Sequence, residues 1–241
     1  MQVVIVCGGL ATRLHPITEK IPKSLIEIKG KPILYYQIKL LKKQGIKDII
    51  LCVGHLSEKI IDYFKDGKKF GVELRYSLED RALGTAGAVK NINENLLQKK
   101  FFVLYGDVIT DVSFQDMRNY HENNNSAATI LIREKKKIGS SLINLNKNFM
   151  ITDFIERPSK DQIEYFKNLG KKNWVNSGLY LLDKEKLDYI PVNKKFDFAY
   201  DLFPSLIKEE ENVFGFPLNG FWRELGKIDR IESFQKAIGV F

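Results

Sequence analysis

The length, composition and charge of this chain limit the classes of protein to which it can belong. Its 241 residues, 44% of them hydrophobic, are enough for one well-buried core, so we expect a single domain. The formal net charge of +8 is spread along the chain rather than gathered in one block, which argues against a nucleic-acid partner. The apolar runs are too short for a membrane span or a signal peptide, so we expect a cytoplasmic protein without a membrane partner.

Buried strands alternate with amphipathic helices in the first half of the chain. Apolar runs predict strands over residues 3–7, 49–53 and 101–105, and residues 72–76 also read as a strand. Helical spacing predicts one helix from Pro32 to a stop at Gly45, one capped by Ser57, and one over 86–96. The alternation predicts an α/β fold with a mostly parallel central sheet flanked by helices, whose ligands lie beyond the carboxyl ends of the strands.

The second half of the chain is less regular. Apolar runs predict strands over 127–132, 151–155 and 178–182, and a helix around 198–207. Asp229 and Glu232 form a capping-box-like start for a last helix, with Ile231, Phe234 and Ile238 on one face. The sequence has no hexapeptide period, so we expect no left-handed β-helix tail.

The two cysteines, Cys7 and Cys52, lie inside apolar, strand-like runs. They have neither CxxC spacing nor neighbouring histidines, which a zinc site or a redox pair would need. We therefore expect two thiols in the core.

A glycine pair and two cations follow the first predicted strand. Gly8 and Gly9 would bring backbone N–H groups close to an anion at the carboxyl end of that strand. The loop matches neither GxGxxG nor GxxxxGK[ST], so the glycines alone are weak evidence. Arg13, a planar donor suited to phosphate, and Lys23, whose backbone is stiffened by Pro22, strengthen the case. These residue types favour a polyphosphate site and leave open a tight turn with surface cations.

The stretch GGLATRLHPITEKIPKSL, residues 8–25, resembles the signature GGxGTRLxPxTxxxPK of the sugar-nucleotide nucleotidyltransferases, or nucleoside-diphosphate-sugar pyrophosphorylases. LEDRALGTAGAV, LYGDVITDV, NSGLYLL and FWRELG resemble the same family in family order. The resemblance is nearest to the mannose-1-phosphate and D-glycero-D-manno-heptose 1-phosphate guanylyltransferases. It implies one Rossmann-like, glycosyltransferase-A-like domain over 1–241, with a nucleotide-binding half over 1–110 and a sugar-phosphate-binding half over 111–241.

The resemblance also implies a reaction: a nucleoside triphosphate and a sugar 1-phosphate give a nucleoside-diphosphate sugar and pyrophosphate, with Mg²⁺. Two anions must be held together for in-line attack on the α-phosphate, so such a site needs clustered cations. GTP is favoured, while cytidylyl, uridylyl and thymidylyl transfer stay open. The alternative of another class is a non-catalytic, sugar-nucleotide-binding regulatory subunit. The sequence defines neither the sugar nor the oligomeric state, and a homodimer is compatible with it.

By this resemblance, individual residues of the chain have expected roles. Arg13 and Lys23 are the expected catalytic cations, acting on the triphosphate and on the α-phosphate. The expected nucleotide-binding residues are Cys7, Gly8, Gly9, Leu10, Glu79, Gly84, Thr85 and Asp107. The expected residues for the sugar phosphate and the metal are Glu156, Arg157 and Asn176, and Asp107 and Glu224, respectively.

Four positions depart from the family pattern, one of them Lys227, which stands where the family's W-x-D-[IV]-G-T stretch has threonine. Glu224 stands where the family has an aspartate as its second metal carboxylate, and Arg157 stands where it usually has lysine. Ala11 stands where glycine is most common. Its methyl group fits a negative φ, so we predict that φ and expect the close phosphate contacts to come from Gly8 and Gly9.

Overall fold

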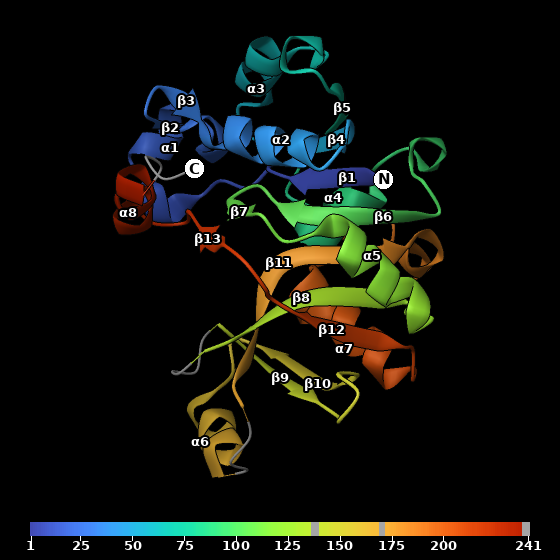
Figure 1. The fold of residues 1–241 in the computed structure, drawn as a ribbon. Helices are drawn as coiled ribbons and strands as arrows, with labels where there is room; N and C mark the ends of the chain where they lie inside the picture. Colours follow the sequence, from blue (N-terminus) through green and yellow to red (C-terminus); the bar gives the residue numbers. More distant parts are fainter. Residues whose placement is uncertain (136–139, 169–171, 238–241) are drawn as a thin grey trace.

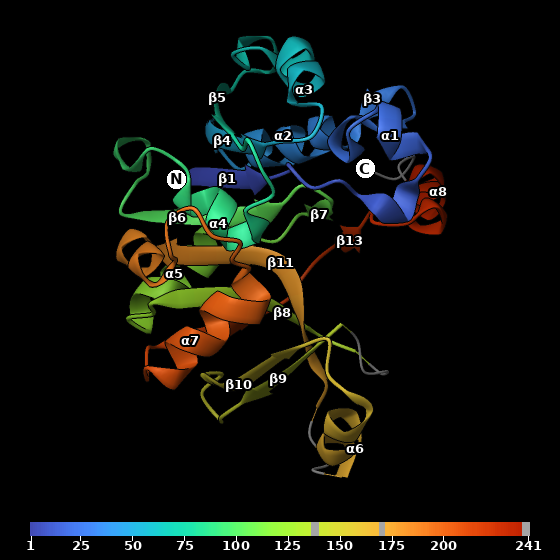
Figure 2. The same cartoon turned by 180° about the vertical axis from the view of Figure 1, so that it is seen from behind.

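The computed structural model in Figure 1 describes residues 1–135, 140–168 and 172–237. Its main feature is a mixed sheet with helices on both faces (Figures 1 and 2). The strands of this sheet are β1 (Gln2–Val6), β4 (Asp48–Val53), β5 (Glu73–Leu78), β6 (Lys100–Tyr105), β8 (Ala128–Glu134), β9 (Ser141–Leu145), β10 (Ile151–Glu156), β11 (Trp174–Asp183) and β12 (Val213–Pro217). They run in the order β10-β9-β11-β6-β1-β4-β5, with β8 beside β11 and β12 beside β8. The predicted α/β fold is confirmed.

Strands β5, β4, β1 and β6 are parallel, and their carboxyl ends meet at one edge of the sheet. Val3 of β1 pairs with Ile49 of β4 on one side and with Phe102 of β6 on the other. Strands β1, β4 and β6 are apolar on both faces because helices cover both sides, as a parallel sheet requires, whereas the edge strand β5 buries Leu74 and leaves Glu73 exposed. The strands predicted for this half of the chain are all present and differ only at their ends.

The rest of the sheet is built on β11, which runs antiparallel to β6. Strand β8 pairs antiparallel with the other edge of β11 and parallel with β12, and β9 and β10 form a hairpin beyond them. The β11–β8 register shifts between Asn176 and Tyr180. Gly178 lies in that shift with a φ of +72°, and a Cβ there would lie 3.1 Å from the Tyr105 ring. This irregular segment therefore lies directly against the end of β6.

Two short ladders lie outside the main sheet: β2 (Glu27–Ile28) with β3 (Lys31–Pro32), and β7 (Val108–Thr110) with β13 (Trp222–Glu224). The helices are α1 (Ile17–Lys20), α2 (Ile33–Lys43), α3 (Ser57–Phe64), α4 (Gly84–Lys90), α5 (Phe114–Asn123), α6 (Lys160–Asn168), α7 (Phe203–Lys208) and α8 (Ile228–Ala237). Among these described helices, none is long and apolar enough to cross a membrane.

The helices cover the sheet in two layers. Ile38 of α2, Phe64 of α3 and Met117 of α5 pack on one face, and Val89 of α4 and Phe203 of α7 pack on the other. Helix α8 lies beside α1 in both views, although the two are separated by most of the chain (Figures 1 and 2). Helix α8 thus lies next to the segment that follows β1, and not next to the first residues of the chain, which lie at the amino end of β1.

Several predicted helix boundaries are wrong. Ser57 is the first residue of α3 rather than its cap, because Leu56 adopts a left-handed conformation before it. Helix α4 ends at Lys90, and a separate 3-10 turn follows over Glu94–Leu96. Helix α8 begins at Ile228, so Asp229 lies inside its first turn and does not precede it.

Other helix predictions have a simpler outcome. The predicted stop at Gly45 is confirmed, with a φ of +75° just after α2. The helix predicted around 198–207 is present as a π-turn over Phe198–Leu202 followed by α7. The contact predicted for Ile238 falls outside the described residues.

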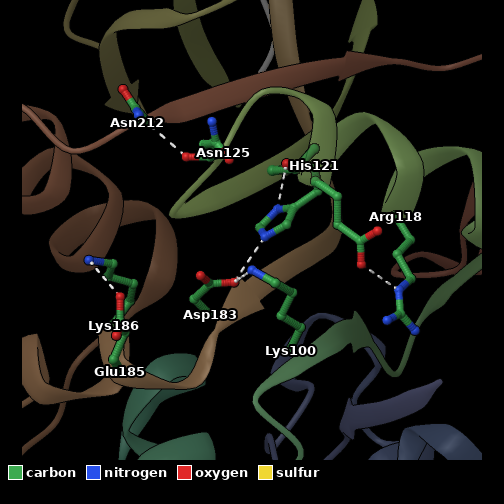
Figure 3. Close-up of polar contacts among 10 residues, drawn as sticks. Lys100, Arg118, His121, Asn125, Asp183, Glu185, Lys186 and Asn212 are labelled. Carbon is green, nitrogen blue, oxygen red and sulfur yellow. Dashed lines mark hydrogen bonds and ion pairs between the residues drawn. The ribbon is translucent and has the colours of Figure 1, made fainter.

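A buried polar cluster joins β6, β11 and α5 at the amino end of β6 (Figure 3). His121 of α5 is fully buried, with its Nδ1 2.9 Å from Thr129 Oγ1 and its Nε2 3.0 Å from Asp183 Oδ1. Lys100 Nζ donates to the same Asp183 oxygen. Burial by itself raises the pKa of Asp183, but the hydrogen bonds from His121 and Lys100 outweigh it and lower that pKa. The cluster ties helix α5 to the sheet.

Candidate active site

The loop after β1 passes very close to the rest of the protein. A Cβ built on Gly8 would lie 2.6 Å from Glu79 Oε1 and 3.1 Å from Gly54 N, so any other residue here would displace the Glu79 carboxylate and crowd the Gly54 backbone. A Cβ on Gly9 would meet no heavy atom within 4 Å, and the Leu10 side chain is 55% exposed. The loop thus packs tightly at Gly8 and is open from Gly9 onward.

The predicted negative φ at Ala11 is wrong, because its φ is 48° and its ψ is 43°, in the left-handed region. The Ala11 carbonyl accepts hydrogen bonds from Leu14 N (2.9 Å) and from Thr18 Oγ1 (3.0 Å). These two contacts hold the backbone at the start of the 3-10 turn Thr12–Leu14. A left-handed alanine costs about 1–2 kcal/mol, so the loop carries backbone strain beside the site.

A cavity of about 280 Å³ lies at the carboxyl ends of β1 and β6. It brings together six of the residues predicted for the nucleotide and for catalysis: Cys7, Gly9, Arg13, Lys23, Thr85 and Asp107. Its other lining residues are Val6, Ala11, Ser24, Tyr105 and Gly106. Gly8, Leu10, Glu79 and Gly84 are outside this lining.

Lys23 and Asp107 form an ion pair at this cavity. Lys23 begins the 3-10 turn that follows Pro22, and Asp107 follows β6 after Gly106. A Cβ on Gly106 would lie 2.8 Å from Cys7 Cβ, so glycine is needed where β6 turns towards Asp107. Each side chain of the pair is 16% exposed. A cation and a carboxylate thus share one half-buried wall of the cavity.

Glu224 reaches the same place from the end of the chain. Strand β13 pairs with β7, which places Glu224 opposite Val108, and Leu225 N donates to Asp107 O at 2.7 Å. A Cβ on Gly226 would lie 2.7 Å from Glu224 Oε1, and 3.5 Å from both Asp107 Oδ2 and Lys23 Nζ. These three charged atoms therefore surround a space that glycine leaves empty.

Asp107 and Glu224 are the pair that could hold a metal ion. In the parts of the chain that the structure describes, no cluster of three or more His, Cys, Asp or Glu side chains is suited to a metal. Mg²⁺ does not need such a cluster, since it commonly binds one or two carboxylates and completes its shell with substrate phosphates and water. The space at Gly226, with a carboxylate oxygen on two sides, fits that donor set.

The segment that contains Gly84 and Thr85 is fixed by a residue that the sequence did not single out. Gly84 has a φ of +75°, and a Cβ there would lie 2.7 Å from Phe196 O. Thr85 N and Thr85 Oγ1 both donate to Asp197 Oδ1 at 3.0 Å, and Phe198 N donates to Thr85 Oγ1 at 3.0 Å. Asp197 thus caps the start of α4 from 112 residues away, and no local motif marks it.

Glu79 lies between the two glycine loops. Its Oε1 faces Gly8, and its Oε2 accepts a hydrogen bond from Leu83 N at 3.3 Å. Burial raises the pKa of Glu79, and the hydrogen bond from Leu83 opposes this only in part. The half-buried Glu79 carboxylate therefore lies beside the Gly8 loop, and its hydrogen-bond donor among the described residues is a backbone N–H rather than a cation.

The residues predicted for the sugar phosphate lie beyond Tyr105. Asn176 Nδ2 donates to Tyr180 OH at 2.8 Å, and the Tyr180 and Tyr105 rings meet edge to face at 5.5 Å. Glu156 ends β10, and its Oε2 is buried with no hydrogen-bond partner among the described residues. Tyr105 also lines the cavity. Tyr105 and Tyr180 therefore lie between the residues predicted for the nucleotide and those predicted for the sugar phosphate.

Burial and two neighbouring charges set the pKa of Glu156. Burial raises the pKa of Glu156 to about 7, the neighbouring Arg157 opposes that rise, and Asp197 adds to it. Arg157 itself is exposed, has a φ of 48°, and lies 6.0 Å from the Tyr200 ring. Glu156 therefore titrates near neutral pH.

The cysteines behave as packed thiols, as predicted. Both are free, Cys52 is buried, and Cys7 Sγ donates to Cys52 O at 3.2 Å. Burial and the nearby Glu79 raise the pKa of Cys7 to about 12, so its thiol stays neutral. Cys7 therefore contributes an uncharged surface to the cavity and is no nucleophile.

The pattern of strands, loops and clustered charges agrees with a match over nearly the whole chain. A family model described as nucleotidyl transferase matches residues 2–239. The chain belongs to the nucleotidyl transferase family. The resemblance given by the sequence motifs is thereby confirmed.

Known members of the nucleotidyl transferase family differ in the base that their names give. The chain is 31% identical to a UTP–glucose-1-phosphate uridylyltransferase from Synechocystis over 95% of its length, and 34% identical to mannose-1-phosphate guanyltransferase 2 from Candida glabrata over 94%. It covers 61% and 62% of these relatives, so it spans about three fifths of their length. Among solved structures, HddC from Yersinia pseudotuberculosis, complexed with GMP-PN, has a TM-score of 0.81 and 25% identity, with 98% of this chain and 99% of that chain covered.

Proposed function

We propose that this protein transfers a nucleotidyl group from a nucleoside triphosphate, with GTP favoured, to a sugar 1-phosphate, releasing pyrophosphate. The observation that carries the proposal is the meeting of Lys23, Asp107 and Glu224 around Gly226, at a cavity that Arg13 also lines. Clustered cations beside two carboxylates suit a reaction in which two phosphate groups must approach each other. The names of the relatives agree with this class of reaction.

The proposed step is an in-line displacement at the α-phosphorus. A phosphate oxygen of the sugar 1-phosphate forms a bond to the α-phosphorus, while the bond from that phosphorus to the bridging oxygen breaks and pyrophosphate leaves. The sugar phosphate is ionised at neutral pH, so the step needs no general base. Lys23 stabilises the charge on the α-phosphate and the incoming phosphate, and the exposed planar fork of Arg13 holds the triphosphate and the leaving pyrophosphate.

We infer that Asp107 and Glu224 hold Mg²⁺ together with the phosphates of the nucleotide. The support is the space at Gly226, which a side chain would fill. When bound, Mg²⁺ neutralises phosphate charge and fixes the orientation of the phosphates. Lys23 pairs with Asp107, and this pair places the lysine at the cavity.

Glu79 supports GTP among the four nucleotides. A carboxylate is an acceptor only, and the N1–H and N2–H₂ groups of guanine offer it two adjacent donors. Uracil and thymine offer one N–H flanked by two carbonyl oxygens, which a carboxylate repels. Glu79 is half-buried beside the Gly8 loop, and a mismatched base would leave the carboxylate with the Leu83 N–H alone as its donor. Uridylyl, cytidylyl and thymidylyl transfer are the outcomes that would correct this assignment.

The sugar side of the proposal depends on Glu156, Arg157 and Asn176. The buried, unpartnered Oε2 of Glu156 supports a role as acceptor for a sugar hydroxyl. Arg157 is exposed, which leaves its planar guanidinium free for a bidentate contact with the sugar phosphate. The identity of the sugar, a cytoplasmic location and a homodimer stay predictions.

The test is a matrix of substrates. The protein is incubated with Mg²⁺, each nucleoside triphosphate and a panel of sugar 1-phosphates, and released pyrophosphate is measured. We expect GTP to be used at least about tenfold faster than UTP, CTP or dTTP, and Glu79→Gln to reduce that ratio, because a lost hydrogen-bond match costs about 1–3 kcal/mol. Faster use of another triphosphate would correct the base.

The competing function, a non-catalytic sugar-nucleotide-binding subunit, predicts a different result. Such a protein would bind a nucleoside-diphosphate sugar in equilibrium dialysis yet release no pyrophosphate from any substrate pair. The three charged groups around Gly226 argue against it, because binding alone does not require a cation and two carboxylates at one point.

A further inference from the structure

Glu224 has its two carboxylate oxygens facing different partners. Oε1 lies at the Gly226 space, on the side of Asp107 and Lys23. Oε2 forms an ion pair with Arg230 Nη1, from the first turn of α8. The side chains of the pair are 26% and 37% exposed, so neither is free in solvent. One oxygen is therefore committed to an arginine while the other is left for a ligand.

The two members of this pair are anchored in the same apolar cluster. Leu225, directly after Glu224, is fully buried there, and Ile231, directly after Arg230, is 8% exposed. Phe234 of α8 joins them and meets the Tyr36 ring of α2 edge to face at 6.0 Å. Because the backbone on both sides of the ion pair is fixed, the pair fixes the orientation of the glutamate side chain.

We propose that Arg230 is a positioning residue for the metal site: by holding Oε2 of Glu224, it presents Oε1 to the ion that Asp107 binds. A glutamate has one more rotatable bond than an aspartate, so an unrestrained Glu224 would lose more conformational freedom on binding a metal. The planar fork of arginine suits this role better than a lysine ammonium does. This inference rests on the proposed function, since it requires Glu224 to be a metal ligand.

A positioning role for Arg230 and simple electrostatics predict opposite changes in metal affinity when Arg230 is removed. Arg230 carries a positive charge next to a cation site, so removing it should by charge alone strengthen metal binding. If Arg230 positions Glu224, removing it weakens metal binding instead, by about tenfold, the lower end of what loss of a ligand's supporting partner costs. The two explanations therefore differ in the direction of the effect.

The experiment is a titration of the whole chain with Mn²⁺, with and without inorganic pyrophosphate, in which free Mn²⁺ is followed by its electron paramagnetic resonance signal. Arg230→Gln is compared with Arg223→Gln, which removes the same charge from an exposed residue next to Glu224 whose contacts are Trp222 O and the Phe221 ring. We expect Arg230→Gln to weaken Mn²⁺ binding about tenfold, and Arg223→Gln to leave it within about twofold because exposed charges are screened.

Two further variants complete the test. Arg230→Lys keeps the charge without the fork, so it should recover part of the lost affinity, and it replaces Arg230→Gln if that variant does not fold. Mn²⁺ binding to Arg230→Gln as tight as, or tighter than, that to the unmodified protein would overturn the positioning role. If Glu224→Gln leaves Mn²⁺ binding unchanged, Glu224 is no ligand, and the metal assignment of the proposed function fails together with this inference. If Glu224→Gln weakens binding and Arg230→Gln does not, only the role of Arg230 fails.

Discussion

The two ends of strand β6 both carry a lysine–aspartate ion pair, but the pairs have different surroundings. At the amino end, Asp183 Oδ1 accepts from Lys100 and faces the fully buried His121 (Figure 3). At the carboxyl end, Asp107 and Lys23 face a space that Gly226 leaves open. The amino-end pair has its partners within the protein, whereas the carboxyl-end pair has room for a ligand.

Cavity size alone would favour the end of β6 opposite to the proposed site. The cavity beside Lys100 and Asp183 is about 450 Å³, larger than the cavity of about 280 Å³ beside Lys23 and Asp107. The smaller one is at the carboxyl ends of parallel strands, and glycine loops and an exposed arginine surround it, which is where α/β proteins bind ligands. An ion pair that borders open space, next to glycine loops, is therefore a better guide to the proposed site than cavity volume is.

The largest expected effect breaks the carboxyl-end pair. Lys23→Ala and Asp107→Ala should each lower the rate of pyrophosphate release by about 10²–10³, because removing one preorganised electrostatic contact has effects of that size. Their melting temperatures should change little, since a partly exposed ion pair stabilises the fold weakly. Lys20→Ala, at an exposed lysine of α1, is the matched control. A near-normal rate in either variant would contradict the assigned roles.

The second effect breaks the amino-end pair. Asp183→Ala leaves the buried His121 without its acceptor, which should lower the free energy of unfolding by about 1–3 kcal/mol. The rate per folded molecule should stay unchanged. Urea denaturation measures the stability, and Glu185→Gln, at an exposed carboxylate that pairs with Lys186, is the control. A loss of rate at constant stability would show that this end also takes part in the reaction.

The third effect concerns pH. Burial raises the pKa of Glu156 to about 7 in the folded protein, above the 4.5 of an unperturbed glutamate, so the native state holds this proton more tightly than the unfolded chain does. Stability is therefore lost as pH rises from about 4.5 to about 7. Glu156→Gln removes this loss, so its gain over the unmodified protein should grow across that window, to the order of 1 kcal/mol after solvent screening.

Urea denaturation between pH 4.5 and pH 8 checks the prediction for Glu156, with Glu164→Gln on the exposed side of α6 as the control. Parallel stability curves for Glu156→Gln and the unmodified protein would show that Glu156 titrates normally.

The smallest effect concerns the strained backbone beside the carboxyl-end pair. Ala11→Gly should raise the free energy of unfolding by about 0.5–1 kcal/mol, because relief of the left-handed strain exceeds the entropic cost of glycine. Thermal denaturation measures it. Ala82→Gly, in an exposed loop, should instead be slightly destabilising. Destabilisation by Ala11→Gly would mean that the methyl group contributes packing that outweighs the strain.

The sequence predicted the parallel half of the fold well, because β1, β4 and β6 contain continuous apolar runs whose pattern needs no tertiary information. It did not predict α5, and of the hairpin of β9 and β10 it predicted only β10. Helix α5 is mostly polar, with only Phe114, Met117 and His121 buried. Only packing against the sheet shows which face of such a helix is inside.

The sequence by itself was enough to select the loop of Gly8 and Gly9, Arg13, Lys23 and Asp107 as candidate site residues. They lie in short motifs whose residue types suit the binding of phosphate and of a metal ion. Only the tertiary structure decided that Arg230 holds Glu224 and that Asp197 caps the segment of Thr85. It also decided the left-handed conformation of Ala11. The physical reason is that these features depend on hydrogen bonds and ion pairs whose partners come from different elements, and spacing along the chain does not encode such contacts.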